Sequence, residues 1–217
     1  MKTNFAINIG RQLGSGGRDI GEQLAKCLDI PFYDKELITI ASQESGLAKD
    51  VFEKADEKTG FSFTSGLFGL RSTFIGDEYI DNYLGNESLF RIQSDVIRNL
   101  NKKNNCVFVG RCADYILRDN PNAINIFICA DIEERIKRVS ERNKLSDKKA
   151  QDLIEKTDKR RASYYNYYSN KEWGKADSYH LCFNSSIGVE NSIKLIEEFV
   201  RVKLGDEYDG VLKCKHK

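Results

Sequence analysis

Apolar residues along the chain fall into two kinds of segment. Short continuous runs, such as CVFV at 106–109 and INIFICA at 124–130, are typical of parallel strands that are buried on both faces of a sheet. Longer segments, such as 18–28, repeat apolar residues at the three- and four-residue spacing of an amphipathic helix. Because the two kinds alternate, the pattern predicts βαβ units around a parallel sheet.

The pattern predicts an α/β fold, a three-layer α/β/α sandwich whose parallel sheet has about five strands. The expected strands are 5–9, 30–33, 106–109, 124–130 and 179–183, and the expected helices are 18–28, 35–43, 49–58, 87–102, 133–143, about 146–168 and 189–204. Segment 59–85 differs because its glycines are interleaved with phenylalanines. We interpret it as a functional insertion rather than as part of the sheet core.

Composition narrows the class of protein. The 217 residues are 40% apolar and 31% charged, as in a soluble globular protein. The formal net charge of +1 gives no general attraction to nucleic acid or to an acidic membrane, so any anion site must be local. The longest apolar runs are far shorter than the roughly 20 residues of a membrane span. We therefore expect neither nucleic acid nor membrane as a partner.

The six cysteines are scattered, and none forms a CxxC pair. Four of them lie in or beside apolar segments, where a cysteine behaves as a small buried hydrophobic residue. This usage favours a cytoplasmic, reducing location, without disulfides or a zinc site.

A glycine-rich stretch, IGRQLGSGGRDIG at 9–21, follows the first expected strand and precedes the first expected helix. Glycines allow successive backbone N–H groups to point into one concavity, and the helix adds its positive N-terminal end. A phosphate is the natural occupant of such a loop. The alternative is a flexible strand-to-helix turn without a ligand.

The loop matches the motif G-x-x-x-x-G-K-[ST] only in part. With Gly16 as the second motif glycine, Arg11 takes the first position and Gly17 takes the position of the lysine. We expect Arg18 to supply the missing cation, and Asp19 either to bind a metal ion or to cap the helix. Two arginines flanking a glycine loop favour an anion. The expected nucleotide-binding residues are Gly14, Ser15, Gly16, Gly17, Arg18 and Asp19.

Over nearly its whole length the sequence resembles the cytidylate kinase-like family of P-loop nucleoside monophosphate kinases. The segments that carry the resemblance are 7–38, VFVGRCADYIL at 107–117, 124–139, KTDKRRASYYNYY at 156–168, and YHLCFNSS at 179–186. The resemblance implies a fold of the P-loop nucleoside triphosphate hydrolase type and phosphoryl transfer from ATP to CMP or dCMP with Mg²⁺. Both a monomer and a homodimer remain open.

The resemblance also suggests residues for the acceptor site. Asp34 corresponds to an acidic residue that opens this site, although it would serve equally well as the N-cap of helix 35–43. Arg111 corresponds to an arginine that grips the acceptor phosphate, and a surface ion pair is its alternative role. The aspartate that follows this arginine in the family is Cys112 here. A base contact from that carboxylate is therefore missing or comes from elsewhere.

Arg160 and Arg161 lie in a stretch that resembles a kinase lid, where arginines close on the phosphates as charge builds up in the transition state. The alternative is an ordinary solvated helix face. The resemblance thus implies a single domain, with a core at 1–34, 87–145 and 176–204, an acceptor-binding insertion at about 35–86 and a lid at about 146–175. Two further functions stay open: a nucleotide-binding sensor or pseudokinase without transfer activity, and a kinase of another small metabolite, such as a nucleoside or a shikimate-like compound.

Overall fold

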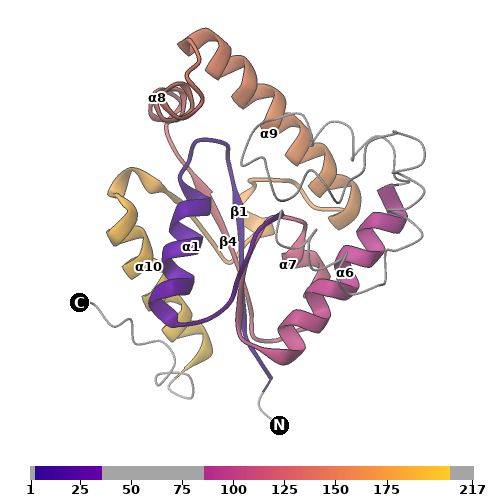
Figure 1. Cartoon of the computed structure of the whole chain (residues 1–217). Helices are drawn as coiled ribbons and strands as arrows, with labels where there is room; N and C mark the ends of the chain where they lie inside the picture. Colours follow the sequence, from indigo (N-terminus) through magenta and orange to yellow (C-terminus); the bar gives the residue numbers. More distant parts are fainter. Residues whose placement is uncertain (1–2, 36–85, 206–217) are drawn as a thin grey trace, which may run out of the picture. The chain divides into compact units, whose positions relative to one another are not determined.

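The structure is a computed structural model that describes residues 3–35 and 86–205 (Figure 1). Three expected segments lie outside these residues: the helices at 35–43 and 49–58 and the insertion at 59–85. Only Lys35, the first residue of the expected helix 35–43, is described. The chain divides into two compact units, Met1–Lys35 with Leu100–Lys217 and Glu36–Asn99. Helix α6 (Asn86–Lys103) leads from the second unit into the first.

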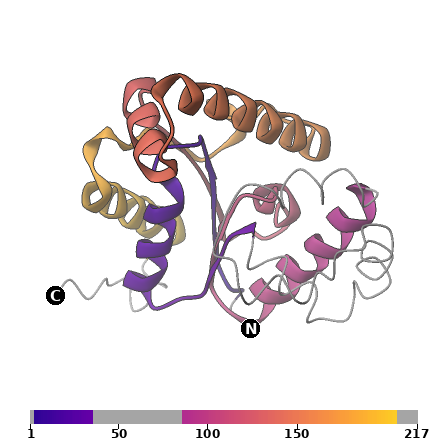
Figure 2. The ribbon, with the colours of Figure 1, turned by 45° about the horizontal axis from the view of Figure 1, so that its top comes forward.

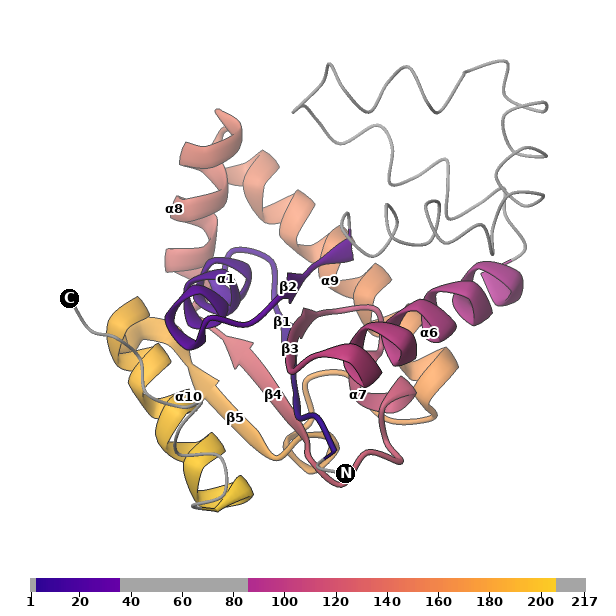
Figure 3. The ribbon, with the colours of Figure 1, turned by 60° about the horizontal axis from the view of Figure 1, so that its bottom comes forward.

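The first unit is built on a parallel sheet of five strands in the order β2-β3-β1-β4-β5 (Figure 3). The strands are β1 (Ala6–Arg11), β2 (Phe32–Tyr33), β3 (Cys106–Val109), β4 (Ala123–Cys129) and β5 (Leu181–Asn184). The central strand β1 pairs with β3 and β4, and Ile7 lies in register with Val107 and Ile124. The central strands are buried on both faces, which explains why their sequences are continuous apolar runs.

Helices lie on both sides of the sheet. The helices of the first unit are α1 (Gly17–Leu28), α7 (Ala113–Ile116), α8 (Ile132–Asn143), α9 (Asp147–Ser169) and α10 (Val189–Leu204). Helices α1 and α10 cover one face, where Leu24 and Ile196 pack with Ile7 and Ile9 in the main core. Helix α7 contacts β1 and β4, and Figure 1 shows it on the face opposite α1.

Helices α8 and α9 form a hairpin beyond the carboxyl ends of the strands (Figure 2). Val139, Ala150 and Ile154 make a small core between them, and Leu13 packs against it. The Ser146 side chain accepts a hydrogen bond from the Lys149 N–H and so caps α9. The hairpin therefore lies beside the glycine-rich loop.

The fold expected from the sequence is confirmed. Strand β3 and helix α10 have the predicted bounds, and most other elements differ by one or two residues. The prediction for the cysteines is wrong at one position, since Cys27 is disulfide-bonded whereas Cys106, Cys112, Cys129 and Cys182 are free. Cys27 is only half-buried on α1, and the spacing of cysteines along a sequence does not reveal which side chains meet in space. Within the described residues, no helix is long and apolar enough to span a bilayer.

Candidate active site

The glycine-rich loop connects β1 to α1 in a tight, defined conformation. Gly14 and Gly16 have φ angles of 81° and 77°, in the left-handed region that favours glycine. A Cβ on Gly14 would also lie 2.8 Å from the carbonyl oxygen of Arg135. Both constraints explain why glycine occupies this part of the loop.

Three consecutive carbonyl oxygens of the loop each accept a hydrogen bond from a different side chain. These bonds are Arg135 Nε to Leu13 O at 2.8 Å, Arg138 Nη1 to Gly14 O at 3.0 Å, and Ser185 Oγ to Ser15 O at 2.6 Å. In a planar trans peptide the C=O and the following N–H point in opposite directions. Because the three carbonyl oxygens point outward to these side chains, the N–H groups of Gly14, Ser15 and Gly16 point toward the inside of the loop.

Those N–H groups are available for an anion. The Ser15 N–H makes a 3.3 Å bond to Gln12 O, but within residues 3–35 and 86–205 no acceptor meets the N–H of Gly14 or Gly16. The Ser15 side chain is buried, and its hydroxyl donates to Gln12 O at 2.9 Å. Ser15 therefore contributes backbone geometry, and its hydroxyl is part of the loop's internal bonding.

Asp158 of α9 holds the loop from a further side. Its Oδ1 accepts the Leu13 N–H at 2.8 Å, and its Oδ2 pairs with Arg135. Burial raises the pKa of the Asp158 carboxyl, while the bonds from Leu13 and Arg135 act in the opposite direction. The loop is thus fastened to both helices of the hairpin.

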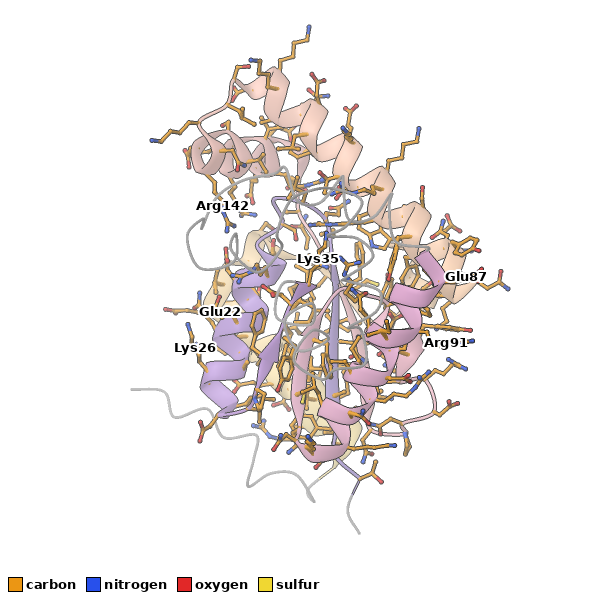
Figure 4. All side chains as sticks on the ribbon, turned by 45° about the vertical axis from the view of Figure 1, so that its right-hand side comes forward. Glu22, Lys26, Lys35, Glu87, Arg91 and Arg142 are labelled. Atoms are coloured by element: carbon orange, nitrogen blue, oxygen red, sulfur yellow. The ribbon has the colours of Figure 1, made fainter. Side chains whose placement is uncertain are left out.

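Arg18, in the first turn of α1, makes contacts with two carboxylates. Its Nε donates to Asp34 Oδ2 at 2.8 Å, and its Nη1 donates to Glu22 Oε2 at 3.0 Å. Glu22 also pairs with Lys26 one turn further on (Figure 4). The Asp34 carboxylate is almost fully buried, so the two sequence-predicted residues Arg18 and Asp34 are brought together as an ion pair.

Arg11, the last residue of β1, has a half-buried side chain that lies between two glycines. Its Cβ would lie 2.7 Å from a Cβ on Gly17, and its Nη1 would overlap a Cβ on Gly110. Burial, together with repulsion from Arg161 and Arg111, lowers the pKa of the Arg11 guanidinium to about 9, so the group still carries its proton at neutral pH. Arg11 therefore lies among other cations.

Arg111 lies in a strained turn at the carboxyl end of β3. Gly110, Arg111 and Cys112 have successive φ angles of 85°, 57° and 53°, a conformation that non-glycine residues rarely adopt. The Arg111 guanidinium lies over the Tyr164 ring, 5.5 Å from its centroid. Strained backbone at the carboxyl edge of a parallel sheet is typical of a ligand site.

Helix α9 brings Arg161 to the same place. Its Nη1 donates to the carbonyl oxygen of Arg11 at 3.1 Å and lies 3.8 Å from Asp158 Oδ1. Arg160 is half-buried one residue earlier on α9. Arg161 therefore contacts the end of β1, where the loop begins.

Asp19 is exposed in the first turn of α1. The described residues hold no group of three or more side chains suited to bind a metal ion. Mg²⁺ usually keeps several waters and takes one or two carboxylates besides the substrate phosphates. A single exposed carboxylate beside a phosphate loop fits that pattern, so Asp19 stays the predicted metal ligand.

The sequence reasoning missed Arg135, Arg138 and Ser185, which fasten the loop. Two arginines three residues apart on a helix are ordinary in a sequence, and Ser185 is one of two adjacent serines. Nothing local distinguishes them, because their role depends on contacts with residues 122 to 170 positions away.

A comparison with known families matches residues 6–187 to the cytidylate kinase-like family. The chain belongs to the cytidylate kinase-like family. The matched region includes the glycine-rich loop, the turn at Arg111, the α8–α9 hairpin and β5. A comparison with curated protein sequences gives no match.

Solved structures share the fold of this chain. An uncharacterised protein from Eubacterium ventriosum is 28% identical, with a TM-score of 0.67, and the alignment covers 91% of this chain and 98% of that chain. Shikimate kinase from Bacteroides thetaiotaomicron is 14% identical, with a TM-score of 0.51 and coverage of 91% and 98%; this likeness concerns the fold. The chain has a P-loop kinase fold, and its family supports a phosphotransferase that acts on a nucleotide or a small metabolite.

Proposed function

We propose that the chain transfers the terminal phosphoryl group of ATP to a small acceptor that carries a phosphate, with CMP or dCMP as the first candidate. The observation that supports this most is the cluster of guanidinium groups at the carboxyl ends of β1 and β3, beside a loop whose N–H groups face inward. We call this set the arginine cluster: Arg11, Arg18, Arg111 and Arg161. Phosphoryl transfer between two phosphates requires this density of positive charge.

The donor nucleotide would bind with its phosphates on residues 14–17 and at the N-terminus of α1. The inward N–H groups of Gly14 and Gly16 and the positive end of the helix suit this role. Mg²⁺, held mainly by phosphates and water with Asp19 as the predicted protein ligand, would neutralise charge on the phosphates.

The acceptor phosphate would bind to Arg111, whose planar guanidinium suits two oxygens of one phosphate. The Tyr164 ring beneath this guanidinium limits the directions that the side chain can take. The predicted role of Asp34 would then be indirect, since its carboxylate orients Arg18 at 2.8 Å. Asp34 would thus position Arg18 without contacting the substrate itself.

Transfer would need no covalent enzyme intermediate. Holding the attacking and leaving oxygens in line and stabilising the charge on the moving group account for catalysis in this class of reaction. Arg161, and Arg160 as the alternative, would supply charge to the transferring group from α9. Exclusion of water by the same helix would favour the acceptor over hydrolysis.

The test is an acceptor screen. The purified chain is mixed with ATP, Mg²⁺ and one acceptor at a time: CMP, dCMP, UMP, AMP, GMP, a nucleoside, or shikimate. Product is measured by separation of the phosphorylated acceptor. We expect turnover with a monophosphate and none with the nucleoside or shikimate, because a nucleoside offers Arg111 no anion and shikimate offers it a carboxylate in place of a phosphate. Turnover with shikimate or a nucleoside alone would refute the acceptor assignment.

A nucleotide-binding sensor without transfer activity is a second candidate. Gly17, which takes the position of the motif lysine, favours it. Tight binding of ATP together with the absence of product from every acceptor in the screen would support the sensor over the kinase.

A further inference from the structure

The side chain of Arg11 accounts for two glycines at once. A Cβ on Gly17 would lie 2.7 Å from Arg11 Cβ and 3.3 Å from Arg11 Cγ, whereas real Cβ atoms essentially never approach another heavy atom within 3.0 Å. At the other end of the side chain, Nη1 takes the space that a Cβ on Gly110 would need. The arginine therefore runs from the start of α1 toward the turn after β3.

The two conflicts differ in how readily they could be relieved. At Gly110 the obstacle is the far end of a flexible side chain, which can swing aside. At Gly17 the obstacle is the Cβ and Cγ of Arg11, which the backbone of β1 holds in place. As long as residue 11 has a side chain of this kind, residue 17 cannot carry one, and a lysine at the motif position is excluded.

The charged end of Arg11 lies beside the turn after β3, among the other guanidinium groups of the arginine cluster. Three of the charged groups that act on it are arginines, Arg161, Arg111 and Arg18, and Asp34 opposes them. The Arg11 backbone is fixed by the bond from Arg161 to its carbonyl oxygen, at 3.1 Å. A cation held among cations gains strongly when an anion binds between them.

Arg18, the residue expected from the sequence to replace the lysine, is held differently. Its guanidinium contacts the Asp34 and Glu22 carboxylates and lies 5.6 Å from the centre of the Phe32 ring. A phosphate at the loop would compete with two carboxylates for this group. Arg11 is therefore better suited than Arg18 to bind the nucleotide.

We propose that the Arg11 guanidinium, reaching from the first position of the loop, supplies the cation that a lysine at position 17 would supply, and binds the polyphosphate of the nucleotide. Gly17 then leaves room for the Arg11 side chain, and the absence of a lysine at position 17 is no sign that nucleotide binding has been lost. The inference deepens the proposed kinase function and rests on it for the identity of the ligand.

The first test measures binding by titration calorimetry, with two probes: ATP with Mg²⁺, and inorganic tripolyphosphate, which has no base. We expect Arg11→Met to weaken both by about 10- to 100-fold, the loss typical of hydrogen bonds to a charged group. The affinity of Arg11→Lys for both probes should lie between those of Arg11→Met and the wild type. Arg142→Met, which removes an exposed guanidinium from α8 (Figure 4), is the control and should bind as the wild type does.

The second test moves the charge. Gly17→Lys alone should weaken binding, since its stem collides with Arg11, and Arg11→Gly alone should weaken binding because the charge is lost. The double variant Arg11→Gly with Gly17→Lys should bind tripolyphosphate at least about tenfold more tightly than either single variant. A double variant no better than Arg11→Gly would overturn the proposal.

Stability separates a ligand-binding role from a structural one. Removing a cation from among cations should leave the thermal midpoint of Arg11→Met unchanged or raised. An Arg11→Met protein that melts earlier or fails to fold, or one that binds both probes as tightly as the wild type, would show that Arg11 is a packing residue and would overturn the proposal.

The outcome for Arg11 can be told apart from the outcome for the kinase. If no acceptor is phosphorylated but ATP binding depends on Arg11, the kinase proposal fails and the role of Arg11 stands. If the wild type and Arg11→Met phosphorylate an acceptor at the same rate, the kinase stands and the role of Arg11 fails.

Discussion

The carboxylate of Asp158 and the backbone N–H of Leu13 are joined by a hydrogen bond of 2.8 Å, although 145 residues separate them in sequence. The same carboxylate pairs with Arg135, whose Nε holds the Leu13 carbonyl oxygen. Both polar groups of one loop residue are therefore satisfied by a single ion pair. The helix that was expected to be a lid is, at this point, a support for the phosphate loop.

Replacing Asp158 should damage both stability and nucleotide binding. Asp158→Ala leaves the buried Arg135 without its carboxylate, so we expect the free energy of unfolding to fall by about 3 kcal/mol in urea titrations. The KM for ATP should rise because the loop loses an anchor. Asp152→Ala, an exposed change on the same helix, is the matched control. If the two variants are equally stable, the ion pair does not fasten the loop.

Gly110 and Gly188 offer a matched pair of alanine substitutions. Their φ angles are 85° and 86°, so each alanine should cost about 1–2 kcal/mol of stability from the left-handed backbone alone. A Cβ on Gly188 meets nothing within 4 Å, whereas a Cβ on Gly110 displaces the end of Arg11. We therefore expect similar urea midpoints but a loss of tripolyphosphate binding only in Gly110→Ala. Equal binding by both variants would place the Arg11 guanidinium elsewhere.

Arg111 should act on the acceptor and little on ATP. We expect Arg111→Ala to raise the KM for the monophosphate by about 10- to 100-fold, the loss of a charge-assisted contact, with a much smaller change in the KM for ATP. Arg111→Lys should recover only part, because a lysine cannot bind two phosphate oxygens in one plane. Steady-state kinetics with each substrate varied in turn checks this. A variant whose two KM values rise together would make Arg111 a general anchor of the site.

The stability of the chain should depend on pH through His180. Its Nδ1 accepts the Asn125 N–H at 2.9 Å, and partial burial, with Lys203 and Lys171 nearby, lowers its pKa below the ordinary 6.5. Above about pH 6.5 the ring is neutral in both folded and unfolded chains. As the pH falls from there toward the lower folded-state pKa, only the unfolded chain takes up the proton, so this contribution to stability is lost.

The measurement is the thermal midpoint across about pH 5 to 8, a window in which histidine is the side chain that ordinarily titrates. His180→Gln should show a flatter profile than the wild type. His216 is present in both proteins, so the difference between the profiles isolates His180. Parallel profiles would mean that the Asn125 bond survives protonation.

The sequence was most informative where burial on both faces left a simple signature. The continuous apolar run CVFV predicts a strand at 106–109, and in β3 every one of these side chains is buried. The last strand was predicted to begin at Tyr179, but β5 begins at Leu181. Tyr179 instead packs against the Phe127 and Tyr165 rings, 5.0 and 5.8 Å away. An aromatic residue that packs across elements looks, in a sequence, like one in a strand.

The site was predictable only in its local part. The phosphate loop could be predicted because its glycines lie close together in the sequence, directly after a predicted strand. The pairing of Arg18 with Asp34 and the position of the Arg11 side chain depend on the distance between elements, which spacing in the sequence does not give. The predicted roles of these residues stay predictions for the variants above to test.

The outward anchoring of three successive loop carbonyls has a thermodynamic consequence. Arg135 and Arg138 of α8, and Ser185 directly after β5, hold those oxygens before any ligand arrives. Because the loop is already ordered in the folded chain, its conformational entropy is lost on folding. A nucleotide that binds to it therefore restricts the loop backbone little further. Affinity for phosphate is therefore built into the folded chain itself, and a change that loosens any of the three anchors would reappear as an entropic penalty on binding.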